Sequence, residues 1–325
     1  MTSPTLTATR RAPLAATVQR YANEWMIVVL FVALVLICSI AIDGFRDLGN
    51  LLNIARQVSF LAIAGLGQFF VILVAKLDLS VGSSIGLTSV LLAGLVANHS
   101  WPMWASVLAV LALSIVIGLV NGVVVVLGKV PAFICTLVMM NVLMGVAYLY
   151  SRGLPIGGLP SWFNYFGMGY LFMIPVPVYA MVIIAVLCSI FTNRTALGRS
   201  FYAVGGNEEA SRLSGINVRW VIMLAFVIAS VLTTLASIGV TSRTMSGGAS
   251  LGEGMLFDII TVVILGGTSL FGGRGNVFGV IVAALLLGVI TNAMVLLGID
   301  TYFQWIIKGA ILIVVVYIDA NSRKS

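Results

Sequence analysis

The sequence predicts an all-α, polytopic integral membrane protein with about ten transmembrane helices, and three observations predict it. Apolar residues make up 61 % of the 325 residues and charged residues only 8 %, whereas soluble domains carry roughly 25 % charged residues. The apolar residues come in long runs, and a helix needs roughly 20 of them to cross the hydrocarbon core. The basic residues stand singly between these runs, as topology determinants do, so the net charge of +7 does not indicate a nucleic-acid-binding face.

Ten apolar runs are candidates for spanning helices. They are 25–42, 57–75, 81–97, 103–127, 130–150, 175–191, 220–242, 255–271, 277–297 and 303–318. With the N-terminus in the cytoplasm, these spans place twelve of the seventeen Lys and Arg residues in inner segments, four in outer segments and one within the last span. This asymmetry follows the positive-inside rule. It predicts a membrane domain at 25–319 between cytoplasmic tails at 1–24 and 320–325.

Two short segments in this domain resemble each other. "GLVNGVVVVLG" (118–128) and "GVITNAMVLLG" (288–298) share glycines ten residues apart and an Asn near the start. The predicted topology makes them run in opposite directions, as in the inverted repeats of many transporters. Chance similarity between Val- and Leu-rich helices explains so short a match at least as well.

The chain lacks the residues that catalysis or nucleotide binding would need. It has one histidine, His99, and three cysteines that each lie inside an apolar run, which gives neither a catalytic triad nor a metal site. The nearest approach to a phosphate loop is "GVVVVLGK" (122–129), but it has five residues between its glycines and no Ser or Thr after the Lys. We therefore expect no enzyme activity, no bound metal and no bound cofactor in this chain.

Ionisable residues inside spans are expensive and are functional candidates by default. Asp258 lies about one turn inside the run 255–271, and Lys308 lies at a similar depth in the run 303–318. Each side chain could reach the membrane interface, or the two could pair across the bundle. Both alternatives stay open at the level of the sequence.

A second polar anomaly is "AKLDLSVGSSIGL" (75–87). It could be a broken helix whose freed backbone faces a polar cavity or, the interpretation we favour, an ordinary loop between two spans. Two asparagines expected to be buried in mid-span could be interhelical hydrogen-bond partners or could line a pathway. The candidate pathway residues are therefore Asp78, Ser80, Ser83, Asn121, Asn141 and Asp258.

The polar block 192–219 is the largest predicted cytoplasmic loop. Within it Asn207 is a favoured N-cap residue and Gly215 a plausible stop, so the pattern predicts a helix of about two turns over 207–214. Its apolar positions are Ala210 and Leu213, followed by Ile216.

Charge supports the same short helix. Glu208 and Glu209 lie in its first turn, where acidic residues complement the helix dipole, and Glu208 stands four residues before Arg212. A helix this short is marginal in water, so something must hold it. The chain's own bundle or the lipid interface could do so, and so could a groove on a cytoplasmic partner.

Within this block, "EASRLSG" (209–215) resembles the Glu-Ala-Ala-x3-Gly loop of binding-protein-dependent ATP-binding cassette permeases, with Ser211 in place of the second Ala. The hydrophobic continuation usual in many such permeases is absent, as in the branch for simple sugars and branched-chain amino acids. "TALGRSFYAVGGNEEASRLSGINV" (195–218), "LDLSVGSSIGL" (77–87) and "FDIITVVILGGTSLFGGRGNVFG" (257–279) are similar to ribose/xylose-type sugar permeases. The resemblance extends from about Asn50 to Asp319.

This resemblance implies a sugar-translocating permease in the bacterial plasma membrane. Its implied partners are a second permease copy in a homo- or heterodimer, a cytoplasmic ATPase that uses ATP and Mg, and an extracytoplasmic sugar-binding protein. The expected ATPase-coupling residues are Gly205, Asn207, Glu208, Glu209, Ala210, Ser211, Arg212, Leu213, Gly215 and Ile216. The alternatives are a stand-alone ion-coupled transporter or channel, and an importer of the same family for a non-sugar solute.

Overall fold

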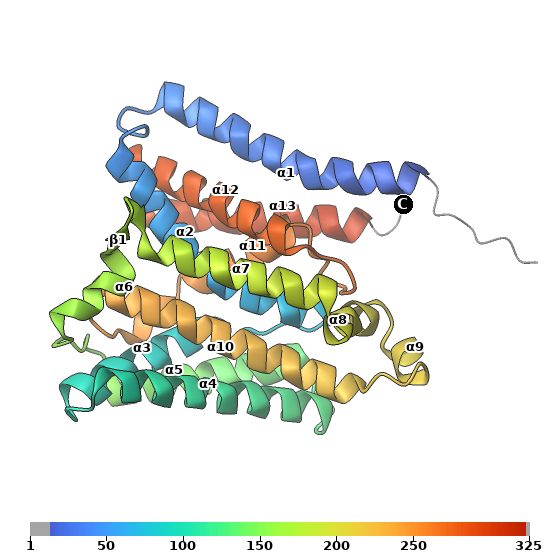
Figure 1. Ribbon diagram of the computed structural model, residues 1–325, viewed down its shortest axis with the longest axis horizontal. Helices are drawn as coiled ribbons and strands as arrows, with labels where there is room; N and C mark the ends of the chain where they lie inside the picture. Colours follow the sequence, from blue (N-terminus) through green and yellow to red (C-terminus); the bar gives the residue numbers. More distant parts are fainter. Residues whose placement is uncertain (1–13, 323–325) are drawn as a thin grey trace, which may run out of the picture.

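The computed structural model describes the backbone of residues 14–322, and ten helices in that part of the chain form the bundle (Figure 1). Each expected span overlaps one of them. The helices are α1 (Leu14–Ala41), α2 (Leu48–Leu73), α3 (Val81–Ala97), α4 (Met103–Val126), α5 (Ala132–Ser151), α7 (Val176–Arg194), α10 (Val218–Thr244), α11 (Met255–Leu265), α12 (Val277–Leu296) and α13 (Thr301–Ser322).

Short elements connect these helices at both ends of the bundle. At one end, η1 (Ser161–Phe163), α6 (Asn164–Met168) and the hairpin of β1 (Tyr170–Leu171) and β2 (Ile174–Pro175) lie between α5 and α7. At the other end lie α8 (Ala196–Gly206) and α9 (Glu208–Leu213). The 3₁₀ turn η2 (Ala249–Gly252) precedes α11.

The helices differ in length. Seven in the described chain are long and apolar enough to cross a membrane, and the apolar part of α1 (Met26–Ala41) and the whole of α3 are somewhat shorter. The eighth expected span, 255–271, is helical only as far as Leu265. Eleven residues rise about 16 Å, roughly half the hydrocarbon thickness. The helix stops there because Gly267 has a φ of +84° and the chain turns.

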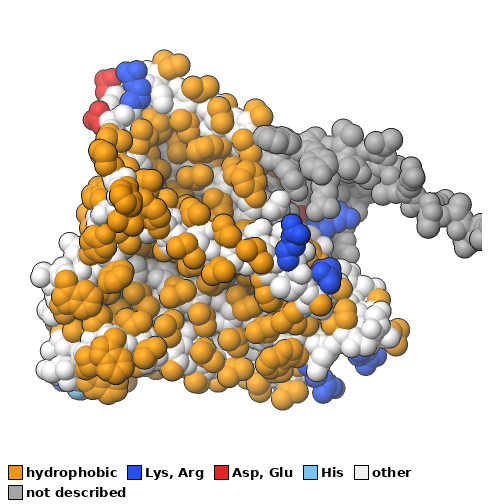
Figure 2. Space-filling model, in the orientation of Figure 1, with side chains coloured by type: hydrophobic (Ala, Val, Ile, Leu, Met, Phe, Trp, Pro, Cys, Tyr) orange, Lys and Arg blue, Asp and Glu red, His pale blue; other side chains and the backbone are white. Residues whose placement is uncertain are grey.

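Helix α2 lies at the centre of the bundle. It packs against α7, α10, α11 and α12, and nearly every residue of its second half is buried. Helix α10 joins α2 to α3 and α4, while α1 packs on α12 and α13 on α11. The outer faces of α4, α5, α7 and α13 expose large apolar side chains. Figure 2 shows such side chains covering the visible flank, as a lipid-facing surface requires.

Helices meet most closely at glycines. A Cβ at Gly67 of α2 would lie 2.9 Å from the Ala229 carbonyl oxygen of α10, and one at Gly118 of α4 would lie 2.7 Å from the Val227 Cα. On α3, a Cβ at Gly86 would overlap the carbonyl oxygen of Ala249. These positions require glycine because backbone contacts backbone there.

The two ends of the described chain lie at the same end of the bundle. Figure 1 places the start of α1 and the end of α13 at the end that carries α8 and α9. This agrees with an even number of crossings. The two segments of the possible repeat, 118–128 and 288–298, lie mainly in α4 and α12, which run in opposite directions (Figure 1); the repeat itself stays a prediction.

The charged pair inside the bundle joins α11 to α13. Lys308 Nζ lies 2.7 Å from Asp258 Oδ2, and the two side chains are only 16 % and 15 % exposed. Of the two alternatives that the sequence left open, pairing across the bundle is the one observed. Each charge thereby neutralises the other in a low-dielectric environment.

Replacing Gly86 with Ala should lower the free energy of unfolding by about 1–3 kcal/mol, because the new methyl group meets a backbone oxygen that cannot rotate away. Gly309→Ala on α13 is the matched control, since a Cβ there meets no heavy atom within 4 Å. Thermal unfolding of the detergent-solubilised protein measures both. Equal melting temperatures for the two variants would contradict the proposed close contact.

Removing one partner of the buried pair, as in Lys308→Met, should lower the free energy of unfolding by about 3–5 kcal/mol because it leaves the Asp258 carboxylate uncompensated. The double variant Lys308→Met/Asp258→Leu should regain most of that loss. The same thermal unfolding assay completes the double-mutant cycle. A double variant no more stable than the single ones would show that the pair is not what joins α11 to α13.

Candidate functional site

The polar block 192–219 folds into two short helices at one end of the bundle (Figure 1). The predicted helix is confirmed as α9. The Asn207 side chain accepts a hydrogen bond from the Ala210 backbone N–H at 2.9 Å, and Gly215 ends the helix with a φ of +83°. The cap and the stop both depend on residues within or next to the helix, so the sequence alone could predict them.

Helix α8 was not predicted. Thr195 is its N-cap, and the Thr195 hydroxyl accepts from the Gly198 N–H at 2.9 Å. Leu197, Phe201 and Val204 follow at helical spacing and face the bundle, where Phe201 packs edge-on against Phe70. A threonine cap followed by this apolar pattern would have predicted the helix.

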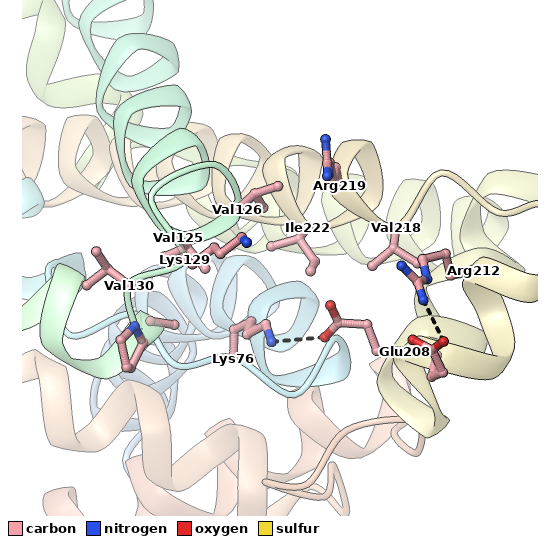
Figure 3. A pocket seen from close by; sticks show the side chains of 13 residues that line it. Lys76, Val125, Val126, Lys129, Val130, Glu208, Arg212, Val218, Arg219 and Ile222 are labelled. Atoms are coloured by element: carbon pink, nitrogen blue, oxygen red, sulfur yellow. Dashed lines mark hydrogen bonds and ion pairs between the residues drawn. The ribbon is translucent and has the colours of Figure 1, made fainter.

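The expected ion pair between Glu208 and Arg212 is wrong. Arg212 Nη2 instead lies 2.6 Å from Glu209 Oε1, and Glu208 Oε2 lies 3.3 Å from Lys76 Nζ (Figure 3). Lys76 belongs to the segment that follows α2, and it approaches α9 from the bundle. A partner so distant in the chain leaves no local signal.

The ten expected coupling residues divide into two groups. Ser211 is only 5 % exposed, Gly205 is buried, and Ile216 is half-buried against the core. These three fix α8 and α9 to the bundle, so the chain itself holds the short helix. The other seven are exposed at its surface: Asn207, Glu208, Glu209, Ala210, Arg212, Leu213 and Gly215.

A cavity of about 430 Å³ opens beside α9, between the α4–α5 turn and the start of α10 (Figure 3). Its walls are mixed: apolar side chains such as Val125 and Ile222 line it together with charged ones from α9 and the neighbouring connections. Lys129 and Arg219 line it and make no ion pair within the described residues.

A buried polar cluster begins two residues after Lys76, which lines this cavity. Asp78 Oδ1 accepts hydrogen bonds from the Ser80 N–H at 2.8 Å and from the Ser80 hydroxyl at 2.6 Å. The Asn121 amide donates to Ser80 Oγ at 3.1 Å, and the Ser83 hydroxyl donates to the Ser80 carbonyl at 3.4 Å. Four of the six candidate pathway residues therefore meet, and all four are buried.

The segment 74–80 carries this cluster and answers the question left open for 75–87. It is a non-helical connection between two separate helices, as the favoured loop interpretation predicted, but Asp78 and Ser80 within it are buried. Thr136 was missed, although its hydroxyl donates to the Leu77 carbonyl at 3.1 Å. A threonine inside an apolar run gave no sign of this contact.

The remaining two candidates lie elsewhere. Asp258 pairs with Lys308. Asn141 was expected to be buried in mid-span, and that expectation is wrong: it is exposed on the outer face of α5 and donates to the Leu137 carbonyl at 2.9 Å. Helix α5 is apolar all round, so its sequence did not indicate which face turns inward. No three His, Cys, Asp or Glu side chains gather as a metal site among the described residues.

Comparison with known proteins assigns the family. The family described as the permease component of branched-chain amino acid transport systems matches residues 50–316. The ribose import permease protein of Haemophilus influenzae is 39 % identical over 304 residues, covering 92 % of this chain and 94 % of that protein. The ribose import permease protein of Escherichia coli K12 is 38 % identical over 311 residues, covering 93 % of this chain and 97 % of that protein.

A more distant relative is the L-arabinose transport system permease protein of Escherichia coli K12, which is 33 % identical over 305 residues and is covered to 92 % by this chain. No solved structure matches the chain.

Membership confirms the expected kind of protein. Members are multi-pass membrane subunits of bacterial importers; they bind no cofactor, are not enzymes, and work with a separate ATPase and a binding protein. The match covers most of the chain, and it includes the polar block and the segment 74–80. The chain therefore belongs to the family of ATP-binding cassette importer permeases described as the permease component of branched-chain amino acid transport systems.

Proposed function

We propose that this chain translocates a small sugar, with pentoses as the first candidates, in an importer energised by a separate ATPase. The observation that carries the proposal is the identity of 38–39 % with two ribose import permeases over more than nine-tenths of each chain. Permeases named for xylose and arabinose are also similar, at 31 % and 33 % identity. An extracytoplasmic binding protein delivers the sugar.

We propose that the end carrying α8 and α9 faces the cytoplasm, together with both termini. The distribution of basic residues supports this orientation. Lys76, Lys129, Arg199 and Arg219 all belong to connections and helix starts at that end. The exposed apolar faces of α4 and α5 are the proposed contact surface for a second permease copy, identical or not.

The exposed surface of α9 is the proposed contact for the ATPase. It presents charged and apolar groups together. Leu213 is 78 % exposed, and Glu209 and Arg212 form an ion pair on the same short helix. Leu213 would give the ATPase an apolar side chain to bury at the centre of this contact. Gly205, Ser211 and Ile216 act from beneath by positioning this surface.

The pathway role is proposed for the four candidates that cluster: Asp78, Ser80, Ser83 and Asn121. Their buried hydrogen bonds join the start of α3 to α4. We propose that this cluster shapes the cytoplasmic end of the sugar pathway, because an ionisable side chain buried in a membrane domain, here Asp78, is a functional candidate by default. Asn121→Leu should accordingly lower sugar uptake more than it lowers the amount of folded protein.

Reconstitution tests the proposed function. Proteoliposomes that contain this chain with its ATPase and binding protein should accumulate ribose, xylose or arabinose when ATP is supplied on the ATPase side. Branched-chain amino acids serve as the matched non-sugar solutes. Uptake of an amino acid but no sugar would reassign the solute, and sugar uptake by the chain alone under an ion gradient would favour the stand-alone transporter.

Labelling tests the proposed orientation. A cysteine in place of the exposed Leu213 should react with a membrane-impermeant maleimide only when the cytoplasmic side is opened. The native cysteines Cys38, Cys135 and Cys188 are buried, so they give little background. A cysteine at Phe172, 87 % exposed in the β1–β2 turn, should react from the opposite side. Reversed reactivity of the two variants would overturn the orientation.

A further inference from the structure

One ion pair connects α9 to a part of the chain that is remote in sequence. Lys76 Nζ lies 3.3 Å from Glu208 Oε2, with the side chains 23 % and 57 % exposed, and Figure 3 shows the two pointing toward each other across the cavity edge. The other ion pair of α9, between Arg212 and Glu209, is internal to the helix. Among the described residues, Lys76 is thus the only charged group that ties α9 to another element.

Lys76 lies in a segment whose start is held by backbone hydrogen bonds. The Leu73 carbonyl at the end of α2 accepts a hydrogen bond from the Gly273 N–H at 2.9 Å, and the Lys76 N–H donates to the Val71 carbonyl at 3.1 Å. Between them, Ala75 takes a left-handed conformation with a φ of +56°. The chain thus leaves α2 along one defined course, and Lys76 projects from it toward α9.

Helix α8 contacts the same segment through backbone. A Cβ at Gly205, near the end of α8, would overlap the Leu73 carbonyl oxygen, and a Cβ at Gly272 would lie 2.7 Å from the Ala75 N. The α8–α9 unit therefore contacts this segment at two points. One is a rigid contact at Gly205, and the other is the ion pair at Glu208, three residues farther along.

The segment leads directly into the buried polar cluster. Leu77, next to Lys76, accepts from the Thr136 hydroxyl of α5 at 3.1 Å, and Asp78 accepts from Ser80. Ser80 in turn accepts from the Asn121 amide of α4 at 3.1 Å. Lys76 is therefore the direct neighbour of a residue hydrogen-bonded to the start of α5, and it lies four residues before Ser80, whose bond with Asn121 joins the start of α3 to α4.

We propose that Lys76 is a positioning residue that transmits the displacement of α9 by the ATPase to the Asp78–Ser80–Asn121 cluster. This inference rests on the proposed function and adds the route of coupling within the chain. Helix α9 is six residues long with one buried side chain, Ser211, so it is easily displaced. The backbone contact at Gly205 stays in place, and the Lys76–Glu208 distance changes most.

The strength of the pair suits this role. Partly exposed ion pairs contribute little to stability, so this one can break and form again in each transport cycle. The formed and the broken pair then favour different arrangements of the segment 74–80. Coupling between the ATPase contact on α9 and the buried polar cluster requires such a difference. A less exposed pair such as Asp258 with Lys308, with side chains 15 % and 16 % exposed, would instead resist each cycle.

Charge reversal tests the route in the complete importer, with ATP hydrolysis and sugar uptake measured in the same proteoliposomes. Lys76→Glu should lower the sugar transported per ATP hydrolysed about threefold or more, because attraction to Glu208 becomes repulsion. ATPase binding, measured by co-purification, should stay unchanged. Lys76→Arg should preserve the ratio, and Lys76→Glu combined with Glu208→Lys should restore much of it.

Lys129→Glu is the matched control. Lys129 lines the same cavity but makes no ion pair among the described residues, so the same charge reversal there should leave the ratio unchanged. If Lys76→Glu leaves the ratio at the wild-type value, the proposed route is wrong. An equal loss in Lys129→Glu would also overturn it, because any negative charge at the cavity would then suffice.

A second measurement needs no sugar and so separates this inference from the proposed solute. Cysteines at positions 76 and 208 are joined with a short bis-maleimide in the complex with the ATPase, first without nucleotide and then with a trapped ATP analogue. The rate of cross-linking should differ between the two states. The same rate in both would show that the Lys76–Glu208 distance does not respond to the ATPase, even if the importer proves to carry another solute.

Discussion

Direct contact between helix backbones is what the bundle depends on, because lipid tails are as apolar as leucine and provide no hydrophobic drive for helices to associate. Attraction then has to come from close packing, and close packing needs positions without side chains. Gly67 on α2, Gly118 on α4 and Gly86 on α3 are such positions, each against the backbone of a neighbour. The first two hold α2 and α4 against α10, and the third holds α3 against η2. Because α3 also packs on α10, these four helices form the core around which the more exposed helices are arranged.

The segment 74–80 is built under the same constraint. Backbone that leaves a helix inside a membrane protein must find its hydrogen-bond partners in the protein. Here the Leu73 carbonyl is satisfied by Gly273, the Leu77 carbonyl by Thr136 and the Ser80 N–H by Asp78. The polar residues of the sequence anomaly therefore have a structural reason to be there, and the proposed transport role uses an arrangement that the fold already requires.

Local patterns made most of the architecture predictable from the sequence. Ten apolar runs correspond to ten helices, and the cap at Asn207 with the stop at Gly215 predicted α9. Helix α8 was missed although Thr195 and the apolar spacing after it were available. Contacts between distant residues could not be predicted, because neither Lys76 nor Glu208 carries a sign of its partner. The face of α5 that bears Asn141 was misjudged because an apolar helix in lipid has no polar side to mark its outer face.

The pair of Asp258 and Lys308 has a consequence for biosynthesis. Chains are made from the N-terminus, so α11 enters the membrane before α13 exists. Until then the Asp258 carboxylate has no lysine beside it, and an unpaired charge in lipid is unfavourable. Until the last helix is synthesised, α11 therefore lacks the partner that stabilises Asp258 in its final position. Completion of the chain, and not insertion of each helix in turn, settles the final position of α11.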